Sequence, residues 1–215
     1  MGLNKNIRVL HKELEKIPLR STLFIKLIRS IKFHFLNSFW KLMFWGKFRL
    51  QGSSINYPFD GDGYVLYKSQ SIIIEREVSI RARSYLSIFE GASFRIGQGT
   101  NIGNDFVVSC VYEIEIGRNV LIADRCFIGD TNHDYQDVNI PIKMGEMIPG
   151  SVKIGDDSWI GINVAILRNV TIGRHCGIGA NSVVTKDIPP YSIAAGNPAR
   201  IIKQYDWEKG EWVTC

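Results

Sequence analysis

An aliphatic residue recurs every six positions in the second half of the chain, and this period limits the possible folds more than any other feature. The series is Ile154, Ile160, Ile166, Ile172, Ile178 and Val184. Four positions after each of the first five members stands a small side chain, at Ser158, Val164, Val170, Cys176 and Ser182. A helix has a period of about 3.6 and a strand a period of about 2, so neither produces this pattern. A fixed period of this kind is typical of a solenoid.

The period predicts an all-β fold, a parallel β-helix in which three hexapeptides complete one triangular coil. We expect each aliphatic residue to point into a narrow interior and the small residue to fit where a corner closes. The same series occurs earlier, first at Ile96, Ile102 and Val108, then shifted by two at Ile116, Ile122 and Ile128. Residues 71–94 are strand-like but irregular, and we interpret them as degenerate first coils. The predicted β-helix domain covers residues 61–203, and residues 204–215 are expected to form a C-terminal tail.

Residues 134–151 interrupt the period with two prolines and two glycines, directly after His133. The period resumes at Val152, so we interpret this segment as a loop inserted into an intact coil. An excursion of this length is usually functional or disordered, and its place after a histidine favours function. The four cysteines form no CxxC pair, which indicates neither a zinc site nor a disulfide framework. We expect Cys126 and Cys176 to pack in the core.

The positive charge of the chain is concentrated at its N-terminus. Residues 1–50 hold 11 Lys and Arg and two Glu, which leaves 15 basic and 19 acidic residues in the remainder. Residues 1–60 are predicted to form a basic, amphipathic α-helical segment, divided by Pro18. Residues 20–50 interleave lysines with aromatic residues, which suits contact with an anionic membrane surface. Capping of the open edge of the first coil is an equally good interpretation.

Other classes of protein are disfavoured by the composition. No run approaches ~18 apolar residues, which argues against a membrane-spanning helix, and the charges near the N-terminus argue against a cleavable signal. We therefore expect a cytoplasmic protein, peripheral at the membrane if residues 20–50 bind there. No nucleic-acid-binding module is recognisable, so we expect no nucleic-acid partner. A content of 11 Phe, 5 Trp and 8 Tyr excludes a disordered chain.

The chain resembles the hexapeptide-repeat acyltransferases over residues 96–203, about half of its length. The motifs that carry the resemblance are VKIGDDSWIG at 152–161, IGANSVVTKDIPPYSI at 178–193 and AGNPARII at 195–202. Together with TNHDYQD at 131–137, they look most like the sugar and polysaccharide O-acetyltransferases. The resemblance implies a left-handed β-helix, acetyl-CoA as co-substrate without a metal, and a homotrimer with its active sites between neighbouring coils.

The resemblance also implies that His133 is the general base. A sugar hydroxyl is a poor nucleophile until its proton is removed, and a neutral imidazole titrates near working pH. Asp130, Asn132 and Asp134 are near in sequence and could orient the ring. For the carbohydrate acceptor, the resemblance suggests Asn104 or Asp105, one coil earlier, and we add Asn132. Trp159 lines the predicted cleft, although packing between copies would explain it equally well.

The family binds pantetheine along a groove between coils and a phosphate near the last coils. The matching positions are Gly161, Gly179, Ala180, Thr185, Lys186 and Arg200. Gly and Ala allow close approach to the backbone, and Lys and Arg complement phosphate. The chain departs from the family at Ile162, where relatives commonly carry a small or polar residue, so the thioester contact at that position is open.

We therefore predict transfer of acetyl from acetyl-CoA to a sugar hydroxyl of a bacterial surface polysaccharide (O-antigen or capsule), or of its lipid-linked precursor. An alternative is a small acceptor: a free sugar, a nucleotide-linked amino sugar or a xenobiotic. A γ-type carbonic anhydrase would need three histidines on a metal, and the predicted coil offers only His133 and His175. A non-catalytic scaffold is disfavoured because the TKDIPPY and GNPAR segments accompany a loop histidine.

Overall fold

The computed structural model describes residues 49–50, 54–55, 71–81 and 83–215 of the 215-residue chain. The helix predicted for residues 1–60 and the membrane contact predicted for residues 20–50 lie almost entirely outside the described residues. The four described residues of this range, Arg49–Leu50 and Ser54–Ile55, are strands that pair with the first coil and are not helical. Contacts divide the chain into two units, Met1–Leu42 and Met43–Cys215. All of the described residues belong to the second unit.

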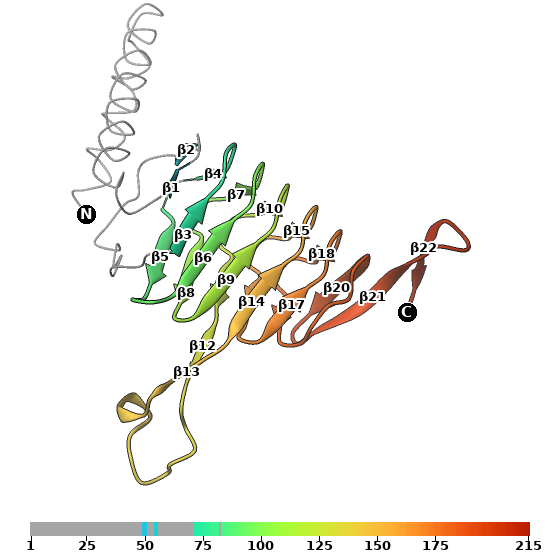
Figure 1. Cartoon of the computed structure of the whole chain (residues 1–215). Coiled ribbons are helices and arrows are strands. Elements are labelled where there is room, and N and C mark those ends of the chain that lie inside the picture. Colours follow the sequence, from blue (N-terminus) through green and yellow to red (C-terminus); the bar gives the residue numbers. More distant parts are fainter. Residues whose placement is uncertain (1–48, 51–53, 56–70, 82) are drawn as a thin grey trace, which may run out of the picture. The chain divides into compact units, whose positions relative to one another are not determined.

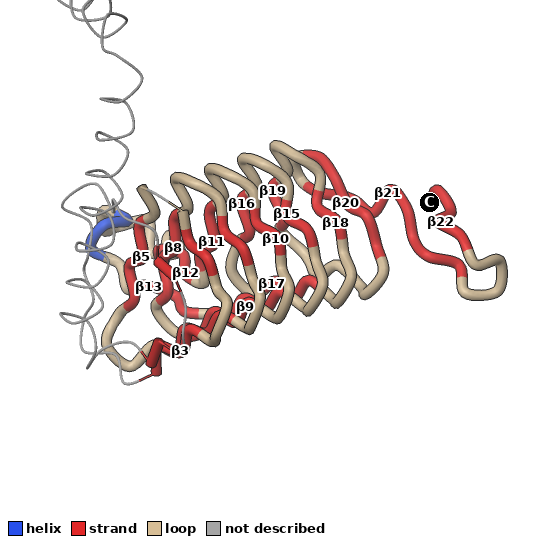
Figure 2. The backbone as a smooth tube through the Cα atoms, turned by 90° about the horizontal axis from the view of Figure 1, so that it is seen from above, coloured by secondary structure: helices blue, strands red, loops and turns tan. Residues whose placement is uncertain are grey.

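The second unit is an all-β solenoid of about six turns, as the hexapeptide period predicts (Figure 1). Each complete turn from β3 to β19 contributes one strand to each of three sheets, and neighbouring strands within the coil are parallel. The tube in Figure 2 shows these turns stacked along one axis. We name the sheets A, B and C in the order in which the chain visits them, and the corners between them the A–B, B–C and C–A turns.

The strands are short, and most span two to four residues. Sheet A contains β1 (Arg49–Leu50), β3 (Ser71–Ile74), β6 (Ser93–Ile96), β9 (Glu113–Ile116), β14 (Ser151–Ile154) and β17 (Val170–Ile172). Sheet B contains β2 (Ser54–Ile55), β4 (Ser79–Ile80), β7 (Asn101–Ile102), β10 (Leu121–Ile122), β15 (Trp159–Ile160), β18 (Gly177–Ile178), β20 (Ser192–Gly196), β21 (Ala199–Asp206) and β22 (Glu211–Thr214). Sheet C contains β5 (Tyr85–Ile88), β8 (Val107–Cys110), β11 (Phe127–Gly129), β16 (Ala165–Ile166) and β19 (Val183–Val184).

The core is made of three aliphatic ladders, one for each sheet. The sheet A ladder is Ile74, Ile96, Ile116, Ile154 and Ile172. The sheet B ladder is Ile80, Ile102, Ile122, Ile160 and Ile178. The sheet C ladder is Leu86, Val108, Ile128, Ile166 and Val184. All fifteen side chains are buried, so the series predicted to point inward does so. Burial of one such side chain contributes about 1.5–3 kcal/mol, which makes these ladders the main source of stability.

The small-residue positions and the cysteines also lie where the sequence predicts. Ser158, Val164, Val170, Cys176 and Ser182 are all buried. Cys126 and Cys176 are buried free thiols, and burial raises the pKa of each. The Sγ of Cys126 donates to the carbonyl of Gly161 at 3.1 Å. These thiols pack in the core, as expected.

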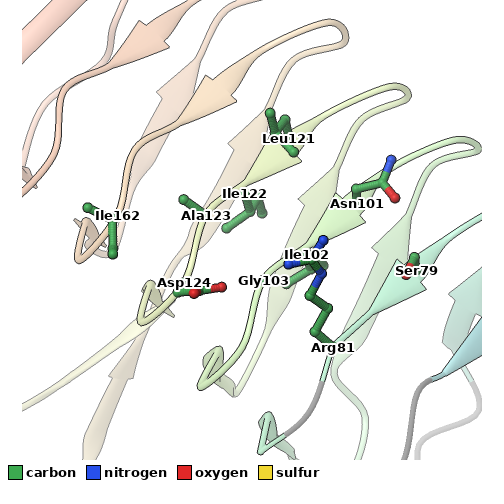
Figure 3. A pocket seen from close by; sticks show the side chains of 10 residues that line it. All are labelled: Ser79, Arg81, Asn101, Ile102, Gly103, Leu121, Ile122, Ala123, Asp124 and Ile162. Carbon is green, nitrogen blue, oxygen red and sulfur yellow. The ribbon is translucent and has the colours of Figure 1, made fainter. Parts of the chain in front are cut away.

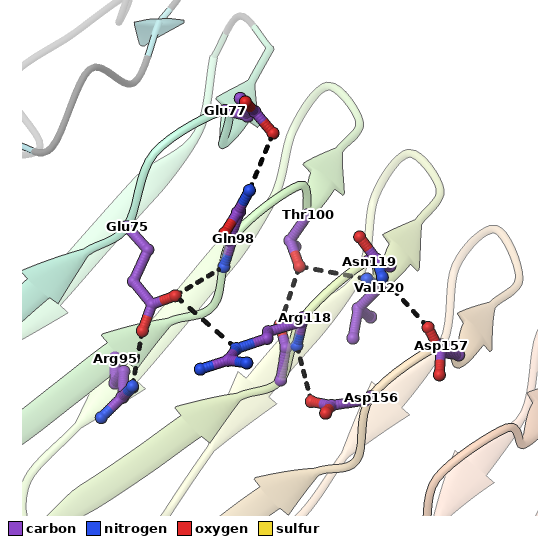
Figure 4. Close-up of polar contacts among 11 residues, drawn as sticks. Glu75, Glu77, Arg95, Gln98, Thr100, Arg118, Asn119, Val120, Asp156 and Asp157 are labelled. Carbon is purple, nitrogen blue, oxygen red and sulfur yellow. Dashed lines mark hydrogen bonds and ion pairs between the residues drawn. The ribbon is translucent and has the colours of Figure 1, made fainter.

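The turns are closed by a repeated contact between a carboxylate and the backbone of the preceding coil. Asp124 accepts a hydrogen bond from the N–H of Asn104 at 2.7 Å, and Asp156 accepts one from the N–H of Arg118 at 2.8 Å. Glu75 forms the reverse contact and accepts from the N–H of Gln98 in the coil that comes after it (Figure 4). The strand ladders are interrupted at the corners, and these carboxylates satisfy backbone donors there.

The insertion and the C-terminus both depart from the coil. After β11 the chain leaves as a ribbon of β12 (Thr131–His133) and β13 (Met147–Pro149), which projects from the C–A turn and carries a 3-10 turn at Ile142–Met144 (Figure 1). The insertion therefore begins at Thr131, the first residue of β12, and not at residue 134 as the sequence predicted. At the other end, β20, β21 and β22 pair antiparallel, so the boundary expected at residue 203 falls inside β21. Within the described residues, no helix has the length and apolar character needed to cross a bilayer.

Candidate active site

His133 lies at the far end of the short ribbon, where it pairs with Met147. The ribbon is continued by a hydrogen bond of 2.9 Å from the N–H of Asp134 to the carbonyl of Glu146. The His133 side chain is exposed, and among the described residues no side chain hydrogen-bonds to its ring. An exposed imidazole on a hydrogen-bonded ribbon is accessible to a substrate and is held by its backbone.

The three residues considered for orienting His133 are placed differently from one another. Asp130 is completely buried, and its carboxylate accepts three backbone hydrogen bonds from the preceding C–A turn. The Asp130 carboxylate therefore stabilises the coil and does not face the His133 ring. Asn132 precedes His133 in β12, and successive side chains of a strand point to opposite faces, so the two do not face one site within a single chain. Asp134 accepts from the N–H of Gln136 at 2.9 Å.

Asn104 and Asp105 lie in the B–C turn, at the opposite end of sheet C from the ribbon. The Nδ2 of Asn104 donates to the Oδ1 of Asp124 at 3.3 Å. Asp105 has a positive φ of 57° and forms a two-pronged ion pair of 2.7 Å with Arg83. The hydrogen bond from Arg83 lowers the pKa of the Asp105 carboxyl. Both residues predicted to contact the acceptor therefore stabilise the turn. Within one chain, neither of them lies near His133.

Most of the predicted coenzyme-binding residues line one edge of the coil. Gly161, Gly179 and Ala180 occupy the B–C turns of successive coils, in line with Gly103 and Ala123. A Cβ on Gly161 would lie 2.8 Å from the N of Ala180, and one on Gly179 would lie 2.9 Å from the Cβ of Ala195. The coils approach one another too closely here for larger side chains. The edge of the coil consequently presents backbone rather than side chains.

The cationic residues lie at both ends of the last strand of sheet C. Arg200 on β21 pairs with Ala195, which continues the row of small residues, and its Nη1 donates to the Ala199 carbonyl at 2.9 Å. Thr185 and Lys186 are exposed and follow β19, so they lie at the C–A turn, two coils beyond the turn from which the ribbon leaves. At a strand spacing of about 4.8 Å, this separation along the axis is about 10 Å.

The same B–C edge carries a groove of about 380 Å³ (Figure 3). It is lined by Ser79, Arg81, Asn101, Ile102, Gly103, Leu121, Ile122, Ala123, Asp124 and Ile162. Ile162, the departure from the family pattern, forms one end of this groove. The polar side chains Arg81, Asn101 and Asp124 were not identified from the sequence, because only the stacking of coils places them together. Trp159 is 52% exposed on the same sheet, next to Leu121.

No cluster of three or more His, Cys, Asp or Glu side chains that could hold a metal occurs within residues 71–81 and 83–215 or in the two short strands before them.

Comparison with known proteins places the chain in a family. The model of the bacterial transferase hexapeptide family (six repeats) matches residues 151–186. Galactoside O-acetyltransferase of Escherichia coli is 33% identical over 73% of this chain and 78% of its own. A Mycobacterium tuberculosis protein named a probable acetyltransferase is 38% identical over 81% of this chain, and the chain spans only 59% of its length.

Two further relatives bear on the chemistry. An Escherichia coli protein named for O-acetyl transfer in lipopolysaccharide biosynthesis is 39% identical over 51% of this chain and 60% of its own. The solved structure of a Vibrio cholerae hexapeptide-repeat acetyltransferase, complexed with acetyl coenzyme A, matches with a TM-score of 0.53 and 28% identity, over 73% of this chain and 72% of that one. The repeat, the coil and these matches show that the chain belongs to the hexapeptide-repeat acetyltransferase family.

Proposed function

We propose that the protein transfers acetyl from acetyl-CoA to a hydroxyl of a sugar in a bacterial surface polysaccharide or its lipid-linked precursor. The observation that carries the proposal is an exposed histidine on a ribbon of a coil whose relatives are named as sugar and lipopolysaccharide O-acetyltransferases. The acetyl-CoA complex of the Vibrio cholerae relative supports the choice of donor.

In this proposal His133 supplies the acid–base chemistry. Its neutral ring nitrogen removes the proton of the acceptor hydroxyl while the oxygen attacks the thioester carbonyl. The new O–C bond forms, the C–S bond breaks, and the protonated imidazole returns the proton to the departing thiolate. No residue of the protein needs to be acylated. General catalysis of this kind contributes about 10²–10⁴-fold to the rate.

The B–C edge suits a thin, extended ligand that ends in phosphates. The backbone at Gly161 and Gly179 and the exposed Ala180 leave room for a pantetheine arm along the coil axis. Arg200 lies beside the end of this row. Thr185 and Lys186, at the other end of sheet C, can reach a phosphate only from a ligand that crosses that corner or is held by a second copy. Lys and Arg complement phosphate charge in either case.

A complete site requires two copies of the chain. His133 extends from the C–A turn, whereas Gly161, Gly179 and Ala180 lie at the B–C turn, at the opposite end of sheet C. The ribbon also exposes a series of apolar side chains that the coil of its own chain does not cover: Tyr135, Val138, Ile140, Ile142 and Met144. We infer that these seat the ribbon on a neighbouring copy in a homotrimer of left-handed coils. His133 of one copy then faces the B–C groove of the next.

A thiol-release assay tests the proposal. Acetyl-CoA is incubated with purified bacterial O-antigen and capsular oligosaccharides, and free CoA thiol is measured for the wild type and for His133→Ala. The proposal predicts release with at least one oligosaccharide, reduced in the variant at unchanged CoA affinity. The match to a galactoside O-acetyltransferase favours free galactosides as a second class of acceptor, so these belong in the same panel. Much faster acetylation of free sugars than of any oligosaccharide would transfer the assignment to the small-acceptor class.

A further inference from the structure

Five aromatic rings gather at the C-terminal end of the coil, at the A–B edge. The rings of Tyr191 and Trp207 lie 4.9 Å apart at 83°, and those of Tyr205 and Trp207 lie 4.8 Å apart at 73°. Trp212 stands 5.5 Å from Tyr205 across the β21–β22 hairpin and stacks on His175 at 6.5 Å. We call these five residues the aromatic platform. Neither the acetyl transfer proposed above nor closure of the core uses it.

Trp207 is the exposed indole of the platform. Its side chain is 69% exposed, although indole is among the most favourable side chains to bury. Edge-to-face contacts with Tyr191 and Tyr205 fix its orientation without covering it. A rigid, exposed aromatic ring can stack on a flat ligand at a small cost in side-chain entropy.

A polar groove leads along the A–B edge to this platform. Its two segments have volumes of about 360 and 210 Å³ and share Glu115, Gly117 and Asp156. Three residues of the upstream segment, Glu75, Arg95 and Arg118, interact across three coils, and Figure 4 shows their contacts. The downstream segment ends at Arg174, whose guanidinium lies 5.7 Å over the ring of Tyr191. Groove and platform thus form one continuous surface, which we call the A–B track.

The charges along the track nearly balance, since four cations (Arg95, Arg118, Lys153 and Arg174) and three anions (Glu75, Glu115 and Asp156) line its two segments. Arg95 pairs with Glu75, Lys153 lies 3.2 Å from Glu113, and Arg174 lies 3.5 Å from Asp157. A surface of largely paired charges repels neither sign strongly, and a single excess cation is a weak attraction for a polyphosphate or a nucleic acid. It does offer many hydrogen-bond donors and acceptors at the coil spacing of about 4.8 Å. Neutral chains of hydroxylated six-membered rings match this combination, since their C–H faces stack on aromatic rings and their hydroxyls bond to paired charges.

We propose that the A–B track binds a neutral glycan chain, with one sugar ring stacked on Trp207. The A–B edge is the corner of the triangular coil opposite sheet C, so a chain bound there leaves the ends of sheet C free. As a site for the distal part of an acceptor polysaccharide, the track rests on the proposed function. As a glycan-binding surface, it does not depend on acetyl transfer.

Binding to an array of immobilised bacterial O-antigens, capsular polysaccharides and neutral oligosaccharides tests the proposal. The full chain carries His133→Ala throughout, so that turnover cannot alter the result. We expect retention on at least one class of neutral glycan, a loss of about tenfold or more in affinity with Trp207→Ala or Arg174→Ala, and recovery with Trp207→Phe. Tyr112→Ala, which removes an exposed aromatic ring at the C–A turn, is the matched control and should bind as its parent does.

The outcomes separate this proposal from the proposed acetyl transfer. Absence of binding to every glycan, or equal binding after Trp207→Ala, overturns the track even if thiol release is observed. Binding that depends on Trp207 supports the track even if no acceptor is acetylated. If Trp207→Ala weakens CoA binding by calorimetry and leaves glycan binding intact, the platform holds the adenine ring instead. Unchanged thermal midpoints confirm that the variants are folded.

Discussion

The carboxylate of Asp130 accepts a hydrogen bond of 2.8 Å from the backbone N–H of Tyr112, in the turn of the preceding coil. The N–H groups of Val111 and Glu113 donate to the same carboxylate at 2.8 Å. This turn lengthens one hexapeptide repeat by two residues, which is why the aliphatic series shifts by two between Val108 and Ile116. Asp130 therefore compensates an irregular corner, directly beneath the ribbon that carries His133.

Asp130→Ala should lower the free energy of unfolding by about 3 kcal/mol, because three backbone donors lose a buried acceptor that bonds all of them. Asp130→Asn should cost less, since the amide oxygen can still accept. Denaturant unfolding measures both values. Asp137→Ala, in the exposed loop, is the control and should change stability by less than about 0.5 kcal/mol. Equal stability of wild type and Asp130→Ala would contradict this role of the carboxylate.

Glu75 should make the coil sensitive to acid. Burial alone raises the pKa of the Glu75 carboxyl, but hydrogen bonds from the N–H of Gln98 and from Arg95 outweigh it and hold the pKa below its ordinary value of 4.5. Between the lowered pKa and 4.5, the unfolded state binds more protons than the folded state, so stability rises with pH. The contribution of Glu75 is thus complete above about pH 4.5 and is lost as pH falls through the lowered pKa.

Glu75→Gln should accordingly be less stable than wild type at pH 7, and the difference should shrink as the pH falls toward 3. Unfolding midpoints measured across this range test the sign. A difference that stays constant with pH would show that the ionised form of Glu75 does not matter.

The long-range order of the fold could be predicted from the sequence because one period governs it. Every coil places an aliphatic residue at the same three inward positions, so Ile154 to Val184 are enough to define the core. The corners could not be predicted, since their contacts join residues about 20 or 40 positions apart. The pairing of Arg83 with Asp105 and the burial of Asp130 are examples. The burial of Asp130 also shows that its carboxylate is bound to the backbone of the coil and is not available to orient His133.

The C-terminal hairpin could have been found. Tyr205 and Trp207 precede Glu208-Lys209-Gly210, and Trp212 follows, a pattern of aromatic residues around a glycine-containing turn that favours a hairpin. The hexapeptide period ends before residues 204–215, which is why it predicts only a tail there. The individual residues of the candidate site could be proposed from the sequence, but their relative positions could not. The sequence does not show that His133 and Gly161 lie at different corners of the coil.

Lys186→Ala should weaken CoA binding about tenfold, with a smaller difference at high salt, because a lysine and a phosphate interact through screened charge. Isothermal calorimetry measures the Kd directly. Lys209→Ala, which removes an exposed lysine from the β21–β22 turn, should leave the Kd unchanged. If both variants bind CoA as wild type does, Lys186 is an ordinary solvated charge.

Ile142→Asp should dissociate the proposed trimer, since it places a charge in the exposed apolar series of the ribbon. Sedimentation velocity should show a shift from trimer to monomer at micromolar concentration. Gln136→Asp adds the same charge at a polar position of the same loop and should remain trimeric. A wild-type protein that sediments as a monomer would contradict the shared site at once.

Complementation between two inactive variants tests the central claim most directly. His133→Ala lacks the proposed base, and Ala180→Trp places a large side chain at the B–C turn where the pantetheine arm is proposed to lie. The two proteins are dissociated, mixed in equal amounts, reassembled and assayed for thiol release with acetyl-CoA and the best acceptor. If each site combines His133 of one copy with the groove of the next, the mixture should recover about a quarter of the wild-type rate. A mixture as inactive as its components would show that the site does not lie between copies.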